Sequence, residues 1–182
     1  MMTTKIILMR ISDIGQLPKF FDRYITLVED IDLMSGLVKY QSLFTNDEYE
    51  KVVELGDMVY AKGKWTIREI VQHLIDNERV QSYRALRFSR GDMTILPGYD
   101  EDLLAAGANA NDRSLDALLQ EFEVVRRSSL LLFSSMTEDQ MLIKGNANAI
   151  EISSLSLGFQ IIGHQIHHKN VINDRYFPLL GQ

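Results

Sequence analysis

Apolar residues recur at intervals of three and four positions along four stretches of this chain, which is the spacing of one buried face of an α-helix. No stretch of similar length shows the strict alternation of a half-buried strand. The helices predicted by this pattern cover approximately residues 17–44, 66–90, 114–136 and 153–176. The first stretch contains a potential break at Ser35 and Gly36, so it predicts one or two helices.

The second predicted helix has the clearest boundaries. Thr66 and Glu69 have the spacing of a capping box, in which the threonine hydroxyl accepts from an amide of the first turn and the carboxylate accepts from the cap amide. At the other end, Arg90 suits the negative end of the helix dipole and Gly91 suits a C-terminal cap. The third predicted helix begins in a similar way after Ser114.

Four amphipathic helices in one chain predict an all-α fold, a four-helix bundle. We expect residues 1–182 to form a single domain, with residues 1–16 as an N-terminal extension. A polar, turn-rich loop over residues 92–113 joins the second and third helices and holds one helical turn near residues 102–106. Loops of this length are often functional. A further short turn of helix is predicted after Thr137.

Composition narrows the chemistry that is available. The chain has no cysteine, which excludes disulfides, thiolate ligands and a cysteine nucleophile. A formal net charge of −6 argues against nucleic acid as a partner, because binding to the phosphate backbone requires a basic surface. The first apolar run is too short for a signal peptide, and no later run approaches the length of a membrane span. We therefore expect a soluble, cytoplasmic protein without a membrane partner.

Four arginines on the second predicted helix resemble a track for anions. They spiral around the helix instead of lining one face, so their spacing favours a solvated surface. These residues are Arg79, Arg84, Arg87 and Arg90.

All four histidines lie on two of the predicted helices. His164 and His168 are four residues apart on the apolar face of the last helix, a spacing at which two imidazoles can bind one metal ion. His73 lies at the edge of the apolar face of the second helix and is the natural third ligand. His167 points about 100° away from His168, so it is expected to flank the site.

The alternative is that each imidazole is a buried core residue with its own hydrogen-bond partners. Three buried rings would then need three sets of partners, because an unpaired buried polar group costs roughly 1–3 kcal/mol. A metal ion removes that requirement. Three neutral nitrogens without a thiolate favour one divalent ion, zinc or nickel, and leave coordination positions open for water or substrate.

A general base is harder to assign. Gln165 follows His164, so the zincin arrangement with a glutamate next to the first histidine is absent. Asp76 and Glu78 are the acidic residues closest in sequence to His73, and either could orient an imidazole or accept a proton. The alternative for both carboxylates is an exposed ion pair with Arg79 or another nearby arginine.

Three sequence motifs together resemble the DinB-like superfamily of metal-binding four-helix proteins. These motifs are Gly63-Lys-Trp-Thr-Ile-Arg-Glu69, His73-Leu-Ile-Asp-Asn-Glu78 and Gly163-His-Gln-Ile-His-His168. The similarity extends over roughly residues 17–180. The resemblance implies a four-helix bundle, a three-histidine site at His73, His164 and His168, zinc or nickel as the metal, and a homodimer.

The resemblance implies a metal-dependent hydrolase, with a thiol S-transferase or isomerase that uses a low-molecular-weight thiol as the alternative. In either case the partner is a small-molecule substrate, and the metal would activate water or the thiol. A non-catalytic bundle that the metal only stabilises is the second alternative. If the 92–113 loop brings Tyr99 and Asn111 near the metal as a lid, a substrate pocket is favoured.

Overall fold

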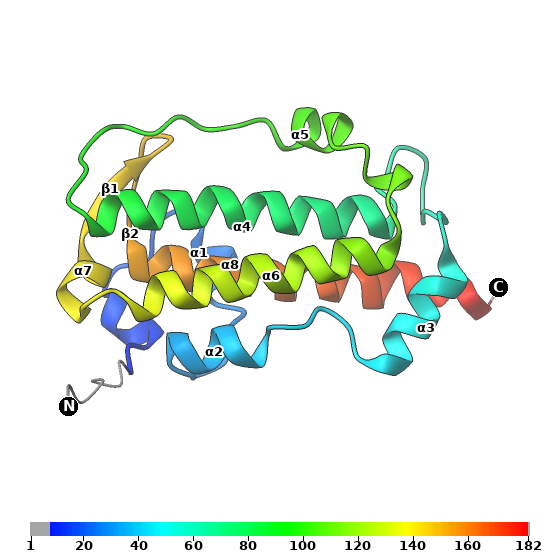
Figure 1. The fold of residues 1–182 in the computed structure, drawn as a ribbon, viewed down its shortest axis with the longest axis horizontal. Coiled ribbons are helices and arrows are strands. Elements are labelled where there is room, and N and C mark those ends of the chain that lie inside the picture. The colour runs from blue at the N-terminus through cyan, green and yellow to red at the C-terminus, as the bar shows by residue number, and fades with distance from the viewer. Residues whose placement is uncertain (1–7, 182) are drawn as a thin grey trace.

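A computed structural model describes residues 8–181 of the chain. The helices and strands in chain order are η1 (Ile11–Ile14), α1 (Asp22–Ile25), α2 (Leu33–Lys39), α3 (Asn46–Leu55), α4 (Ile67–Ser89), α5 (Glu101–Gly107), η2 (Ala110–Asp112), α6 (Leu115–Ser134), α7 (Glu138–Leu142), β1 (Lys144–Ala147), β2 (Ile150–Ser153), α8 (Ser154–Val171), η3 (Ile172–Tyr176) and η4 (Phe177–Gly181). The three long helices, α4, α6 and α8, run side by side, with α4 in contact with both others (Figure 1). The fold is the predicted four-helix bundle with one small sheet. No helix in residues 8–181 is long and apolar enough to cross a membrane.

The fourth side of the bundle is interrupted, and the position predicted for the break was wrong. The helices α1 and α2 are separated by residues 26–32, and Ser35 and Gly36 lie inside α2. The carboxylate of Asp32 caps α2 by accepting from the Ser35 amide at 3.0 Å. Gly36 serves packing, because a Cβ there would lie 2.8 Å from Cδ1 of Ile162 on α8. Glycine therefore lets α2 approach α8 closely without ending the helix.

The boundaries predicted for the long helices are confirmed. Glu69 N donates to Thr66 Oγ1 at 3.2 Å, and Thr66 N donates to Glu69 Oε2 at 2.7 Å, which completes the capping box at α4. Ser114 caps α6 and Ser153 caps α8 through their side-chain oxygens. The last helix continues past Val171 as a π-helical turn, η3, so the helical path reaches Tyr176 as expected.

A helix and a two-stranded hairpin were not predicted. The helix α3 begins at a capping box between Thr45 and Glu48 and packs against η4 near the C-terminus. The strands β1 and β2 form an antiparallel hairpin between α7 and α8. Each strand has four residues, which is too short for alternation to be recognised in the sequence. Gly145 is required in β1 because a Cβ there would lie 2.1 Å from the ring of Phe88.

The long loop crosses the outer face of α4 and contains α5 where one turn of helix was expected (Figure 1). Leu96 pairs with the hairpin, since its amide donates to Asn146 O at 2.9 Å and its carbonyl accepts from Asn148 N at 2.9 Å. At the end of the loop, Arg113 Nη1 donates to Gln72 Oε1 on α4 at 2.6 Å. These contacts attach the loop to the bundle at both ends.

The N-terminal extension is partly described. Residues 1–7 lie outside the described residues, whereas Met9 and Ile14 are buried in the core. Leu33 N donates to Met9 O at 2.8 Å, which fixes the segment beside the start of α2. Residues 8–16 therefore contribute to the packing of the domain.

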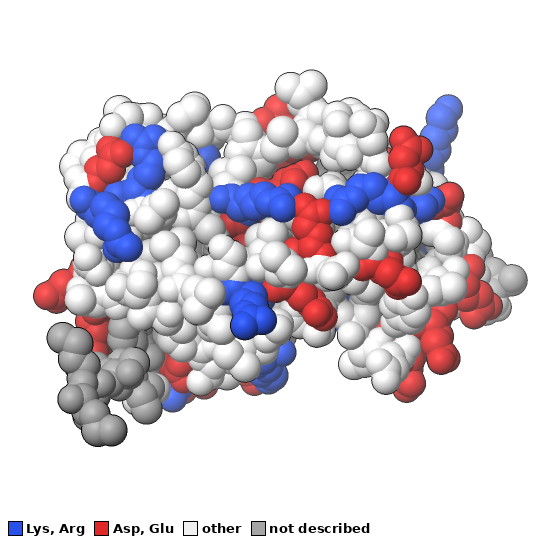
Figure 2. Space-filling view, viewed as in Figure 1, with Lys and Arg blue, Asp and Glu red and all other residues white. Residues whose placement is uncertain are grey.

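Charges are intermingled on the face formed by α4 and α6. Figure 2 shows acidic and basic side chains side by side across this face. Arg79 pairs with Glu121 at 2.6 Å, and Arg113 pairs with the same carboxylate. The expectation of solvated arginines on α4 fits Arg79 and Arg90, which are exposed. It was wrong for Arg84, which is buried with only 4% of its surface exposed.

The apolar core consists of two clusters, and polar residues occupy the middle of each long helix between them. The central interaction in this polar layer joins Glu78 on α4 to Arg126 on α6. Arg126 Nε and Nη2 each donate to Glu78 at 2.9 Å, and Nη1 donates to Gln165 on α8 at 2.9 Å. Both charged side chains are almost completely buried. One guanidinium therefore links three helices of the bundle.

We expect the substitution Arg126→Met to reduce the free energy of unfolding by about 3–5 kcal/mol, because it leaves the buried Glu78 carboxylate without its partner. The double variant Glu78→Met/Arg126→Met should recover much of that loss, since it removes the uncompensated charge. Denaturant unfolding monitored by circular dichroism measures both. Lys144→Met is the control, because the Lys144–Glu151 pair is exposed and should contribute less than about 1 kcal/mol. A double variant as unstable as the single one would contradict this explanation.

Candidate metal centre

Three histidine rings meet where α4 packs against α8. His164 Nε2 lies 3.1 Å from His73 Nε2 and 3.1 Å from His168 Nε2. One ligand nitrogen from each of the three rings lies within 4.8 Å of the other two. His164 and His168 are one turn apart on α8, and the contact between the two helices brings His73 to the same point. The structure thus brings together the three residues named from the sequence.

Burial keeps these imidazoles neutral. Desolvation lowers the pKa of His73 to about 4 and that of His168 to about 3, with neighbouring histidines adding a smaller effect. Burial also lowers the pKa of His164 well below its ordinary value. Electrostatic repulsion of its protonated form by His168 and His73 lowers it further. At neutral pH the three rings therefore carry no charge, the form that binds a metal ion.

The contacts between the rings fit a metal site better than a hydrogen-bonded core. A ring nitrogen has one in-plane direction, which holds either a proton or a lone pair. His164 Nε2 faces two other Nε2 atoms, so it cannot make a good hydrogen bond to both of them. A cation between the three lone pairs would satisfy all three rings at once. The donor set therefore fits a divalent metal ion.

His167 lies beside this cluster, in agreement with its angle on the helix. Its ring centroid is 5.1 Å from that of His168 and 5.5 Å from that of Tyr24. The ring is only partly buried. Trp65, next to the α4 cap, packs against the other side of the cluster, with its ring centroid 4.8 Å from that of His73.

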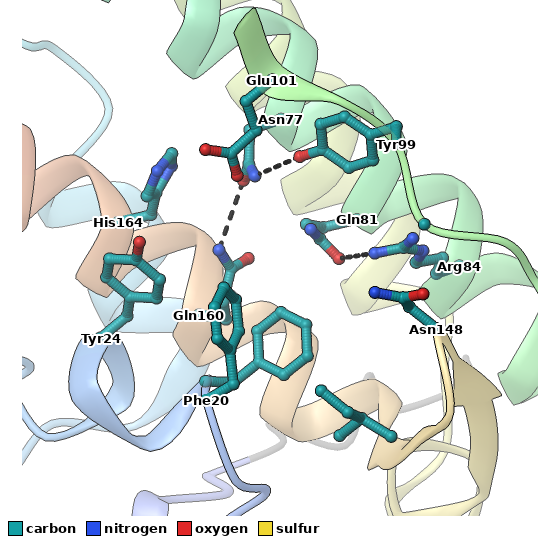
Figure 3. A pocket seen from close by; sticks show the side chains of 13 residues that line it. Phe20, Tyr24, Asn77, Gln81, Arg84, Tyr99, Glu101, Asn148, Gln160 and His164 are labelled. Carbon is teal, nitrogen blue, oxygen red and sulfur yellow. Dashed lines mark hydrogen bonds between the residues drawn. The ribbon is translucent and has the colours of Figure 1, made fainter.

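A cavity of about 140 Å³ opens beside His164 (Figure 3). Its walls come from α1, α4, α8, the loop before α5 and the hairpin turn. Its polar lining includes Tyr24, Asn77, Gln81, Arg84, Tyr99, Glu101, Asn148 and Gln160. Phe20 and Phe21 add an apolar side.

A second cavity, of about 300 Å³, opens beside His168. Its lining includes Lys64, Trp65, Asp102 and His167. The adjacent residues Glu101 and Asp102 line different cavities, so the start of α5 lies between the two openings. The histidine cluster can therefore be reached from two sides.

Asp76 and Glu78, named from the sequence as potential bases, make other contacts. Glu78 is held by Arg126 in the polar layer. Asp76 accepts from Gln72 Nε2 at 3.0 Å and lies 3.8 Å from Arg79, the surface pairing considered as its alternative. In the described part of the chain, neither carboxylate has a hydrogen bond or ion pair to a histidine. Burial raises the pKa of Asp76.

Glu101 was not identified from the sequence. It projects from the start of α5 toward the cavity that His164 lines (Figure 3). Although the residue remains open to solvent, partial desolvation raises the pKa of its carboxyl, against a smaller opposing effect of Arg23. No spacing rule connects residue 101 with the histidines, because a loop positions it.

Of the two loop residues considered as parts of a lid, Tyr99 reaches the cavity beside His164 and Asn111 does not. The Tyr99 hydroxyl accepts from Asn77 Nδ2 at 2.7 Å and lines the cavity beside His164. Asn111 instead accepts from Thr66 Oγ1 at 2.7 Å, at the start of α4. The first part of the loop therefore covers the cavity, and the last part fixes the loop to the helix cap.

The fold and the histidine cluster together define a four-helix bundle with a candidate three-histidine metal centre. The family model described as the DinB superfamily matches residues 42–172, and the chain belongs to this superfamily. The matched region contains all three histidines of the cluster.

The structure is similar to one described as "YfiT from Bacillus subtilis is a probable metal-dependent hydrolase with an unusual four-helix bundle topology". The TM-score is 0.62 at 18% sequence identity, over 92% of this chain and 91% of that one. At this identity the similarity establishes the fold. No curated protein matches the chain.

Gly163 allows α1 to lie against the metal centre, and we expect Gly163→Ala to destabilise the protein. A Cβ there would lie 2.0 Å from the Tyr24 carbonyl oxygen, so α1 would have to move away from α8. This movement would disturb the contact between the Tyr24 and His164 rings, whose centroids are 5.0 Å apart. The cost should be about 1–3 kcal/mol or more, measured by denaturant unfolding. Gly107→Ala is the control, because no atom lies within 4 Å of its added Cβ. Equal stability of the two variants would contradict the assigned role.

Proposed function

We propose that this protein is a metal-dependent hydrolase whose ion is zinc or nickel, held by His73, His164 and His168. The observation that carries the proposal is the convergence of three neutral imidazole nitrogens beside a cavity large enough for a small molecule. The description of the similar Bacillus subtilis protein as a probable metal-dependent hydrolase is consistent with it. An ion with three protein ligands would supply a Lewis acid with positions left open for water and substrate.

The protein's own groups would bind the substrate and move its protons. The three imidazoles provide lone pairs without charge, so no proton has to leave before an ion binds at neutral pH. Phe20 and Phe21 cover one side of the cavity and limit the access of bulk water. Glu101 is our candidate for the proton acceptor, because it lines the same cavity as His164 and because partial desolvation raises the pKa of its carboxyl, which makes the carboxylate a stronger base. For Glu78 we propose a positioning role through Arg126.

A thiol transferase is the second candidate, and the second cavity favours it. A two-substrate reaction needs two compounds at the metal. The histidine cluster borders two cavities, one lined by His164 and the other by His168. A low-molecular-weight thiol could occupy one opening while its electrophile occupies the other. Lys64, which lines the His168 opening, would attract an anionic thiol compound.

We expect the purified protein to contain one zinc or nickel ion, and His73→Ala and His164→Ala to weaken binding at least about 100-fold, because each removes one of three ligands. Elemental analysis and competition with a chelator measure occupancy and affinity. His167→Ala should retain the metal, since this ring lies outside the cluster. Full occupancy in both ligand variants would defeat the proposed site.

For the reaction, we expect hydrolysis of esters or amides that stops on metal removal and returns when the ion is restored. If Glu101 is the base, Glu101→Gln should lower kcat by about 10²–10⁴-fold. If kcat instead falls by that factor in Asp76→Asn and is unchanged in Glu101→Gln, the base is Asp76. Panels of esters, amides and thiol-plus-electrophile pairs separate hydrolase from transferase. A metal-loaded protein inactive in every panel, but with a melting temperature lowered by chelation, would support the non-catalytic alternative instead.

A further inference from the structure

Arg84 is a buried cation without a buried anion beside it. Only 4% of its surface is exposed, yet its guanidinium donates to neutral acceptors alone, Gln81 Oε1 at 3.2 Å and Pro97 O at 2.8 Å. No carboxylate of the described residues forms an ion pair with it. The other deeply buried arginine, Arg126, has both oxygens of Glu78. An unpaired buried charge is costly, and an anionic ligand that binds beside the guanidinium would offset that cost.

Gln160 provides a second, independent sign of a missing ligand. Its Oε1 is the one buried side-chain nitrogen or oxygen within residues 8–181 that has no hydrogen-bond partner. Only 1% of the residue is exposed, so bulk water does not satisfy this oxygen. The Nε2 of the same amide donates to Asn77 Oδ1 at 3.4 Å, which leaves the oxygen as the free end. A buried acceptor of this kind calls for an N–H or O–H donor.

Both groups line the cavity that His164 lines. In Figure 3, His164 and Arg84 stand at opposite ends, and Gln160 lies between them. The hairpin contacts at Leu96 hold the neighbouring Pro97 carbonyl, which in turn holds one arm of the guanidinium. Arg84 is therefore held in place before any ligand binds, which reduces the entropic cost of recognition.

We propose that this cavity binds a small carboxylate, with the carboxylate at Arg84, an N–H donor at Gln160 Oε1 and the reacting end of the molecule toward His164. This names a substrate class for the proposed function. Only the placement of the reacting end toward His164 rests on that function, whereas the contacts at Arg84 and Gln160 do not. A single guanidinium in a cavity of about 140 Å³ suits a monoanion. The Glu101 carboxylate, which lines the same cavity, would repel a more highly charged anion such as phosphate.

Three related probes test the two contacts separately. N-acetylglycine has both a carboxylate and an N–H, N-acetylglycinamide lacks the charge, and N-acetylsarcosine lacks the N–H. We expect N-acetylglycine to bind on the order of tenfold or more tightly than either relative, because each relative leaves one buried protein group unpaired. Dissociation constants from NMR titration measure the difference, in both metal-loaded and chelator-treated protein.

Substitutions at Arg84 and Gln160 test whether these two residues make the proposed contacts with the probes. Arg84→Met should weaken N-acetylglycine by on the order of tenfold or more and abolish its preference over N-acetylglycinamide. Arg84→Lys should retain part of that preference through its charge. Gln160→Met should abolish the preference over N-acetylsarcosine alone. Arg79→Met is the matched control, since Arg79 lies on the same helix but pairs with Glu121 on the surface.

The outcomes separate this proposal from the proposed function. Binding in chelator-treated protein that depends on Arg84 supports the carboxylate site even if no hydrolysis is found. Binding that disappears with the metal and is unchanged in Arg84→Met would place the carboxylate on the ion and overturn the proposal. Equal binding of all three probes, or tighter binding of inorganic phosphate through Arg84, would overturn it as well. The probe series in the unmodified protein decides the matter if Arg84→Met fails to fold.

Discussion

The packing of α4 against α8 is the constraint on which both the fold and the candidate metal centre depend. The two helices bury their apolar faces against each other, and this contact brings His73 to within 3.1 Å of His164, Nε2 to Nε2. Polar contacts fix the same pair of helices elsewhere, since Ser154 Oγ donates to Ala85 O at 3.1 Å. Because close-packed helices cannot slide freely, the distance between the imidazoles is set by the core and does not depend on the flexibility of a loop.

The polar groups in the interior differ in how their burial is compensated. Arg126 and Glu78 compensate each other and connect the three long helices. The three imidazoles avoid the cost of a buried charge by staying neutral. Arg84 and the oxygen of Gln160 lack such compensation, and both line the cavity next to His164. Groups that reduce stability therefore collect at the cavity, as expected where binding has been favoured over stability.

The loop between α4 and α6 completes the site from outside the bundle. Its pairing with the hairpin at Leu96 and its contact with Gln72 through Arg113 hold both ends against the domain. Between these points, Tyr99 and Glu101 reach the cavity at His164, and Asp102 reaches the one at His168. The loop thus supplies polar groups on a scaffold that the helices keep rigid.

The sequence by itself determined the long helices and the pairing of His164 with His168, because both depend on local rules: the apolar period, the serine and threonine caps, and the one-turn spacing of the two histidines. It named His73 as the third ligand from its place on the apolar face of the second helix, but only the packing of α4 against α8 brings that ring to the other two. It failed where contacts between distant segments decide the outcome. The break between α1 and α2, the short hairpin, the burial of Arg84 and the approach of Glu101 to the cavity have no local signal. Helix periodicity leaves a residue's partner on another element undefined, since partners are chosen by packing and burial. Only the tertiary structure could therefore show that a cation and an unpaired amide oxygen line the cavity beside the candidate metal centre.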